Sequence, residues 1–234
     1  MNQSLGILGG LGPLASAEFL KTIYECNLTG GLEQESPKCI LYSDPTFPDR
    51  TDAILGGAED LIVELLTKSL ENLCQMGVSR IVIVCITMHY FLPKVPIFLR
   101  GKVISLIDLI VEEVLNTEKS HLLLCSKGAR QAGIFQTHQH WQLVEKYILL
   151  PNEEDQDVLQ KYIYQVKING CIEPIVNYLN SLFSKYEVDS LIAGCTELHL
   201  INKHMLLSAH KAKEHCIFDP LIDIARNFSK FMVR

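Results

Sequence analysis

The sequence predicts an α/β protein with parallel sheets, and three observations support this fold class. The runs Ile81–Val84 and Leu191–Ala193 are apolar and largely β-branched or aliphatic, as expected of strands buried on both faces of a parallel sheet. Amphipathic helical segments separate the predicted strands. A glycine-containing turn and a cysteine-ended strand occur once in each half of the chain. We therefore expect two α/β halves related by a weak internal repeat.

Composition excludes several classes of protein. The chain has 234 residues, of which 48% are hydrophobic and 21% charged, enough to bury a sizeable core. A formal net charge of −6 without a Lys/Arg cluster argues against a nucleic-acid partner. The sequence contains no apolar run of the ~18 residues that a membrane span needs, and its first residues lack a secretory signal pattern. Eight scattered cysteines without a Cys-x-x-Cys pair indicate reduced thiols, so we expect a soluble cytoplasmic protein.

The first element is a strand from Leu5, followed by a glycine turn and a helix that begins at Pro13. Glycines at such a turn let backbone N–H groups approach an anionic group, which makes Gly10 a candidate binding residue. Gly10-x-Gly12-x-x-Ala15 also satisfies the dinucleotide fingerprint. That fingerprint needs an acidic residue ~20 positions later, and Asp44 lies well beyond this distance, so dinucleotide binding is disfavoured.

The loop after the second strand, residues 43–51, contains two prolines and Arg50. One interpretation is a capped helix start, with Thr51 or Asp52 as the N-cap. The other places Arg50 as a carboxylate clamp, because a guanidinium binds carboxylates in a bidentate way. Spacing alone does not choose between them.

The remaining elements follow from periodicity and turn residues. Lys167, near the end of one helix, could serve simply as a C-terminal cation. In order we expect a helix at 58–76, the strand at 81–84, a short strand at 103–105, a helix at 106–115, a strand at 121–125, a second glycine loop at 126–133, a strand at 147–150, helices from 153 and at 173–186, the strand at 191–193, and a last strand and closing helix over 216–231.

Cys85 and Cys195 both stand at the carboxyl end of an apolar strand, where ligands bind in open α/β sheets. Each has a threonine close behind and a histidine four residues on, His89 and His199. Moving a proton on and off a chiral carbon needs a base on one face and an acid on the other, and cysteine can serve in both roles. Taken singly, either cysteine would more simply be core packing, and the repeated context raises the pair above that alternative.

Two metal-binding interpretations are weaker. Cys85, His89, Cys195 and His199 could bind zinc, but structural zinc sites use tighter ligand pairs. His138 and His140 form another short tract and are more simply solvated residues at a helix start. The cysteines without a second signal are interpreted as structural: Cys26, Cys39, Cys125, Cys171 and Cys216.

These motifs resemble the aspartate/glutamate racemase superfamily, in particular its aspartate racemase branch, over nearly the whole chain. The motifs that carry the resemblance are Gly9-Gly10-Leu11-Gly12-Pro13, Pro48-Asp49-Arg50-Thr51, Cys85-Ile86-Thr87-Met88-His89, Pro151-x-Glu153-Glu154-x-Gln156, Ile163-Tyr164-x-x-Lys167 and Gly194-Cys195-Thr196-Glu197-Leu198.

The resemblance implies two similar α/β domains related by pseudo-two-fold symmetry, with the active site in the cleft between them. We expect one domain at 1–104 plus 210–234 and the other at 105–209. It also implies no pyridoxal phosphate or other cofactor, no metal, and a homodimer. Cys85 and Cys195 would be the catalytic thiols. The substrate, a small amino acid or dicarboxylate, would be bound by Gly10, Arg50, Ile86, Thr87, Ser126, Lys167, Thr196 and Glu197.

Two departures bear on the substrate. Ile86 stands where the family usually has asparagine, and the second glycine loop has Ser126, Ala129 and Phe135 where hydroxyl residues are common. Each lost hydrogen bond to a polar substrate costs on the order of 1–3 kcal/mol. The leading hypothesis is a racemase of aspartate, glutamate or a related amino acid. The alternatives are another acid isomerase or decarboxylase of the superfamily, or a low-activity ligand-binding paralogue.

Overall fold

The computed structural model describes residues 3–28, 30–169, 172–208 and 216–232. The chain divides into two compact units. The first is Met1–Ser105 with Leu221–Arg234, and the second is Leu106–Pro220. Each unit contains its own parallel sheet with helices packed against it, so the predicted α/β class with parallel sheets is confirmed.

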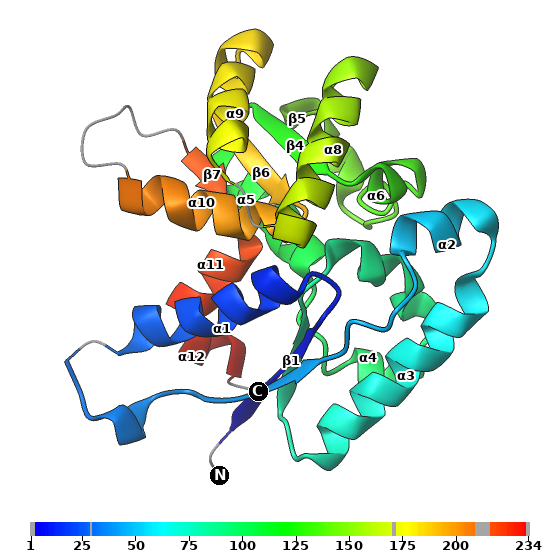
Figure 1. Cartoon of the computed structure of the whole chain (residues 1–234), viewed down its shortest axis with the longest axis vertical. Coiled ribbons are helices and arrows are strands. Elements are labelled where there is room, and N and C mark those ends of the chain that lie inside the picture. Colours follow the sequence, from blue (N-terminus) through cyan, green and yellow to red (C-terminus); the bar gives the residue numbers. More distant parts are fainter. Residues whose placement is uncertain (1–2, 29, 170–171, 209–215, 233–234) are drawn as a thin grey trace. The chain divides into compact units, whose positions relative to one another are not determined.

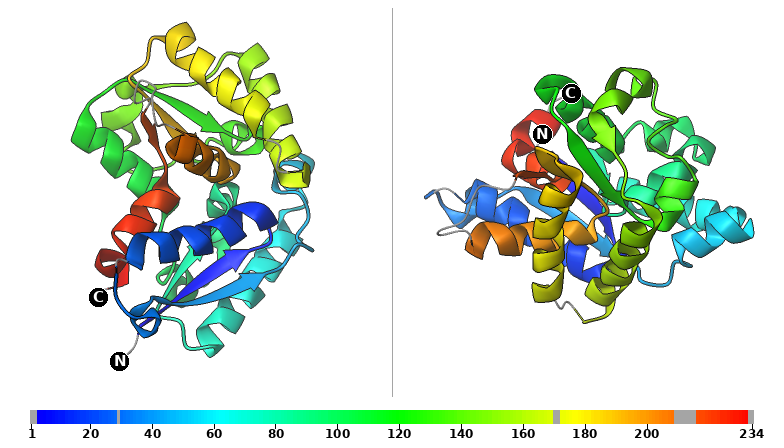
Figure 2. Two further views of the ribbon diagram at one scale, coloured as in Figure 1. Left: turned by 60° about the vertical axis from the view of Figure 1, so that its left-hand side comes forward. Right: turned by 90° about the horizontal axis from the view of Figure 1, so that it is seen from above.

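The sheet of the first unit contains β1 (Ser4–Gly9), β2 (Lys38–Ser43) and β3 (Arg80–Ile83) in the order β2-β1-β3, all parallel. Helices α1 (Pro13–Asn27) and α3 (Glu59–Gln75) lie on either side of this sheet (Figures 1 and 2). Pro13 occupies the first turn of α1, as predicted. The helix therefore starts where a missing backbone N–H costs nothing.

Further elements of the first unit follow its strands. After β1 and β2 come η1 (Glu33–Glu35) and α2 (Arg50–Gly56), and after β3 come η2 (Ile86–Lys94) and α4 (Ile97–Arg100). The predicted strand at 103–105 is wrong. Only Val103 bridges to Ile81, because α5 begins at Leu106 and leaves no length for further pairing.

The C-terminal segment forms two short helices, α11 (Pro220–Arg226) and α12 (Phe228–Met232), where one continuous helix was predicted. The break lies at Asn227. Its side-chain amide donates to the Asp223 carbonyl at 3.2 Å and to the Asp223 carboxylate at 2.8 Å. An asparagine that hydrogen-bonds locally in this way competes with helix continuation.

The sheet of the second unit contains β4 (His121–Cys125), β5 (Ile148–Leu149), β6 (Ser190–Gly194) and β7 (Cys216–Phe218) in the order β5-β4-β6-β7, all parallel. Its helices are α5 (Leu106–Thr117), α6 (Lys127–Gln131), α7 (Trp141–Val144), η3 (Glu145–Tyr147), α8 (Glu153–Asn169), α9 (Glu173–Tyr186) and α10 (Glu197–Ser208). Cys171, interpreted above as structural, lies outside the described residues.

Each unit has an apolar core that reaches the carboxyl end of its central strands. In the first, Leu66, Leu70 and Leu73 of α3 are fully buried against β1 and β3, and the same cluster includes Cys85. In the second, apolar residues of α8, α9 and α10 pack against β4 and β6 in a cluster that includes Cys195. Both cysteines therefore lie at the edge of a packed core.

Within the described ranges, no helix combines the length and apolar character needed to traverse a bilayer.

His121, at the start of β4, makes the stability of the second unit depend on pH. Its ring is 1% exposed, and its nitrogens lie 3.0 Å from the hydroxyls of Ser190 and Thr117. Burial lowers the pKa of His121 below its ordinary value of 6.5. The unfolded chain then binds the proton more readily than the folded one. We therefore expect the free energy of unfolding to decrease as pH falls through about 6.5.

Urea unfolding at pH 7.5 and pH 5.5 measures this effect. The variant His121→Gln should lose less stability between the two pH values than the wild type does, while His140→Gln, at an exposed position, should keep the wild-type difference. Equal losses in wild type and His121→Gln would contradict the assignment.

Candidate functional site

The first cysteine turn leaves β3 at its carboxyl end. Cys85 has extended backbone angles, its N–H donates to the Ile83 carbonyl at 2.8 Å, and its carbonyl accepts from Met88 at 3.2 Å. The residue is 9% exposed and packs in the apolar cluster of its unit. The segment after this cysteine is a 3₁₀ helix, η2, which contains Pro93.

The second cysteine turn lies between β6 and α10. Gly194 precedes the cysteine, and a β-carbon on it would come within 2.8 Å of the Leu124 carbonyl oxygen, so this position has room only for glycine. Cys195 is 7% exposed, and its thiol donates to Glu197 Oε2 across 2.9 Å. The other carboxylate oxygen, Oε1, lies 3.9 Å from Lys167 Nζ. A thiol, a carboxylate and an ammonium group thus adjoin one another.

This arrangement joins three sequence-predicted site residues within the second unit. Glu197 is 3% exposed, while the Lys167 side chain, on the last turn of α8, is 22% exposed. A buried carboxylate needs partners, and here the thiol and the ammonium supply them. Lys167 therefore does more than complement the helix dipole, which was its simpler interpretation.

The neighbouring predicted residues are buried in the same turns. Ile86 is 1% exposed, and its carbonyl accepts a hydrogen bond from His89 Nδ1 at 3.1 Å. Thr87 is 7% exposed, and Thr196 is 4% exposed with its carbonyl accepting from the His199 N–H at 3.1 Å. Each of the three lies in the first turn after its cysteine.

Sequence reasoning missed a residue that contacts the helix after the second cysteine turn. Asp219, directly after β7, accepts from His199 Nδ1 across 2.7 Å, and both side chains are almost completely buried. Its only sequence signal is an acidic residue at the end of a predicted strand.

Backbone conformation and close packing explain the glycine at position 10 of the first glycine loop. Gly10 has φ +84°, and a β-carbon on it would lie 2.3 Å from the backbone of Asp44. Its N–H donates to Ser16 Oγ at 3.3 Å. The loop therefore approaches the protein's own backbone closely at Gly10.

Arg50 joins this loop to the segment before α2. Its Nη2 donates to the Leu11 carbonyl at 2.6 Å and its Nη1 to the Pro48 carbonyl at 3.0 Å. The predicted N-cap, Thr51 or Asp52, is wrong. Asp49 caps α2, because its carboxylate accepts from the N–H groups of both residues at 2.8 and 3.1 Å. An N-cap accepts from the second and third residues of its helix, and here α2 begins at Arg50.

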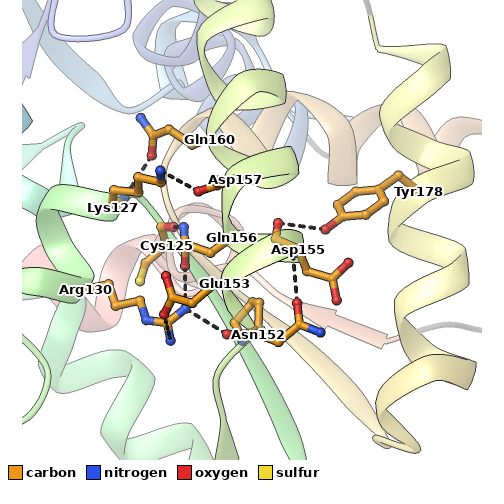
Figure 3. Close-up of polar contacts among 11 residues, drawn as sticks. Cys125, Lys127, Arg130, Asn152, Glu153, Asp155, Gln156, Asp157, Gln160 and Tyr178 are labelled. Atoms are coloured by element: carbon orange, nitrogen blue, oxygen red, sulfur yellow. Dashed lines mark hydrogen bonds and ion pairs between the residues drawn. The ribbon is translucent and has the colours of Figure 1, made fainter.

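The second glycine loop is attached to α8 (Figure 3). Ser126 caps α6 by accepting from the Ala129 N–H at 3.2 Å, and the Lys127 N–H donates to Gln160 Oε1 at 2.8 Å. Gln156 Nε2 donates to the Cys125 carbonyl at 2.9 Å. Two of the N–H groups at the start of α6 are thus bonded to side chains of the protein itself.

Charged contacts reinforce this attachment. Arg130 Nη1 donates to the Pro151 carbonyl at 2.7 Å, its Nη2 lies 3.2 Å from Glu153 Oε1, and Lys127 Nζ pairs with Asp157 (Figure 3).

Burial raises the pKa of the Cys125 thiol to about 12, so this cysteine remains protonated near neutral pH, as its structural interpretation requires.

Helix α8 is also fixed to α9. Asn152 Oδ1 accepts from the Asp155 N–H at 2.9 Å at the start of α8, and the Asp155 carbonyl accepts from Tyr178 at 2.9 Å (Figure 3). The Asp155 carboxylate accepts from Tyr186 at 2.5 Å and pairs with Lys185 at 2.6 Å. Both ends of α8 thus have partners in the second unit, Lys167 being paired with Glu197.

Within the parts of the chain that the structure describes, no three His, Cys, Asp or Glu side chains gather as a potential metal site. His138 and His140 have ring centroids 5.5 Å apart, and His138 Nε2 lies 3.4 Å from Asp108.

Comparison with known families decides the relationship. The Asp/Glu/Hydantoin racemase family profile matches residues 8–221, which is most of the chain. The chain belongs to this family. It is therefore an isomerase of the amino-acid racemase type, as the resemblance of its motifs implied.

Individual relatives agree with this membership. The broad specificity amino-acid racemase RacX of Bacillus subtilis is 24% identical over 215 residues, covering 86% of this chain and 88% of the relative. The aspartate racemase of Picrophilus torridus has a similar fold, with a TM-score of 0.76 at 24% identity over 95% and 94% of the two chains. An aspartate racemase homologue from Pyrococcus horikoshii gives a TM-score of 0.67 at 20% identity over 99% of each chain.

Proposed function

We propose that this family member is a cofactor-independent amino-acid racemase in which Cys85 and Cys195 act as acid and base at the α-carbon. One thiolate removes the α-proton, and the other thiol delivers a proton to the opposite face, so that one proton is taken up for each one given. The observation that carries the proposal is the hydrogen bond from the Cys195 thiol to Glu197 at 2.9 Å. A buried packing cysteine has no need of a buried carboxylate partner.

Glu197 has a specific part in this proposal. Its carboxylate can accept the thiol proton and return it, which makes Cys195 available as the base. Lys167 at 3.9 Å compensates the negative charge of Glu197 in a site that excludes most water. The turn around Cys85 offers an apolar environment, so the two thiols differ in the polarity of their surroundings.

The substrate is proposed to be aspartate, glutamate or a related amino acid. Arg50 and Lys167 are the proposed carboxylate ligands, with Gly10, Thr87, Ser126 and Thr196 as further contacts. The burial of the apolar Ile86 in the first turn favours a preference that extends beyond acidic amino acids. The name of the Bacillus subtilis relative, a broad specificity amino-acid racemase, supports testing neutral substrates as well. A homodimer in the cytoplasm completes the proposal.

Deuterium exchange tests the function directly. The reduced protein is incubated in D₂O with each L- and D-amino acid of a panel that includes aspartate, glutamate and neutral residues. NMR follows the α-proton, and chiral chromatography follows the enantiomers. We expect exchange together with inversion for at least one amino acid. Inversion that required added pyridoxal phosphate, or exchange with none of the panel, would contradict the proposal.

The role of Glu197 is tested with Glu197→Gln. The amide can still accept a hydrogen bond from the thiol but cannot take its proton, so kcat should fall about a hundredfold, at the lower end of the range for general acid–base catalysis. KM should change much less. Steady-state kinetics of both directions give the two constants, with Glu187→Gln, at an exposed position, as the control. A rise in KM at unchanged kcat would instead assign Glu197 to substrate binding alone.

A further inference from the structure

Each cysteine turn contains a histidine four residues after the cysteine, and both rings are buried. His89 is 7% exposed and His199 is 0% exposed. Histidine is usually found at intermediate depth, and a buried ring needs a hydrogen-bond partner. The sequence repeats the Cys-x-x-x-His spacing in both halves, and the proposed acid–base chemistry does not use either histidine.

The two rings share a tautomer but differ in their partners. His89 Nδ1 lies 3.1 Å from the Ile86 carbonyl oxygen, and His199 Nδ1 lies 2.7 Å from Asp219 Oδ2. A carbonyl oxygen and a carboxylate oxygen only accept, so Nδ1 carries the proton in both rings. The pair with Asp219 has the short length of a charge-assisted hydrogen bond, which is roughly twice as strong as a neutral one.

Each contact closes the segment that carries a thiol. His89 lies within η2, and its bond to Ile86 fixes the residue that directly follows Cys85. His199 lies in the first turn of α10, where its own N–H donates to the Thr196 carbonyl. Its backbone thus contacts the residue that directly follows Cys195, while its ring ties this first turn of α10 to Asp219.

Asp219 provides the fixed end of the second contact. It follows β7, which pairs with β6 in the register Ile192↔Phe218, two residues before β6 ends at Gly194. The carboxylate of Asp219 therefore joins the end of one strand to the turn that leaves its neighbour. In addition, Asn202 Nδ2 of α10 lies 3.4 Å from the Ile217 carbonyl of β7, a weaker contact in the same direction.

We propose that His89 and His199 are positioning residues, each of which fixes the turn that carries the cysteine four residues before it, and that Asp219 fixes His199 for this purpose. The proposal deepens the function proposed above and rests on it for its catalytic consequence. Thiol reactivity, however, is measurable without turnover. Because the His199 contact is charge-assisted and the His89 contact is not, substitution at His199 should have the larger effect.

Per-cysteine alkylation by iodoacetamide, followed by mass spectrometry of the full chain's peptides, tests the proposal. His199→Leu should shift the alkylation rate of Cys195 and leave that of Cys85 unchanged, and His89→Leu should do the reverse. Cys125 is fully buried and reports on folding in every sample. His199→Asn, whose amide nitrogen can reproduce the Nδ1 donor, should restore the wild-type rate.

Kinetics provide the second measurement. His199→Leu should lower kcat about a hundredfold, the loss that a 1 Å misplacement can cause, with little change in KM. Loss of the ring removes a hydrogen-bond partner of the buried carboxylate of Asp219, which is costly, so His199→Leu can unfold. His199→Gln is the substitute in that event. Its amide reaches the position of Nε2 and loses the Nδ1 contact while it keeps polarity and volume.

The outcomes separate cleanly. A selective shift at the matching cysteine, with rescue by His199→Asn, supports positioning. Equal shifts at both cysteines, or an unchanged Cys195 rate in a folded His199→Gln protein, overturn it. If the wild type racemises no amino acid and the selective shift is still found, the proposed function fails while the positioning of the thiols stands.

Discussion

Replacing Cys195 with alanine is expected to lower the rate of racemisation by roughly 10²–10⁴-fold, the usual contribution of one acid–base group. The physical reason lies in the two half-reactions. Cys85 remains and can still remove the α-proton from the enantiomer that presents it, and solvent deuterium then returns to the same face. One enantiomer should therefore exchange its α-proton without inversion, and the other should be inert. NMR in D₂O, run separately on each pure enantiomer, measures this.

The converse variant makes the test reciprocal. Cys85→Ala should leave exchange in the opposite enantiomer only, through Cys195 and Glu197. Cys74→Ala is the matched control, since this cysteine also packs against the apolar cluster of the first unit. Its racemisation should equal that of the wild type. If both alanine variants exchanged the same enantiomer, a single base would be at work, and the two-thiol mechanism would be wrong.

The sequence predicted most strands and helices of the fold because their signals are local. Runs such as Ile81–Val84 are buried on both faces of a parallel sheet, and their composition alone indicates this. The errors occurred where a neighbour in space decides the structure. Residues 103–105 have strand-like composition, but only Val103 forms a bridge, to Ile81 of β3.

The candidate site shows the same limit. The sequence motifs identified Cys195, Glu197 and Lys167 as candidate site residues. Because Glu197 lies only two residues after Cys195, the contact between these two side chains could be inferred from the sequence. Asp219 was not accessible, because its contact with His199 spans 20 residues. Local periodicity carries no information about such a pair. It becomes visible only when the register of β6 and β7 is known.

Gly10→Ala is expected to produce a large loss of stability. The left-handed φ of +84° costs an L-residue with a β-carbon about 1–2 kcal/mol. In addition, the new β-carbon would lie 2.3 Å from the backbone of Asp44, which no rotamer change can relieve. The loop must move, and it would carry Leu11, the hydrogen-bond acceptor of Arg50, with it. We therefore expect a loss well above the backbone penalty, measured by urea unfolding.

Gly77→Ala separates the two contributions within one protein. Gly77 has nearly the same φ, +81°, but a β-carbon on it would meet no atom within 4 Å. This variant should lose only the backbone penalty of about 1–2 kcal/mol and keep its activity. The excess loss in Gly10→Ala then measures how closely the first glycine loop must approach Asp44. Equal losses would mean that the loop adapts to a side chain, and the requirement for glycine at position 10 would then reflect something other than packing, such as a ligand that binds the loop.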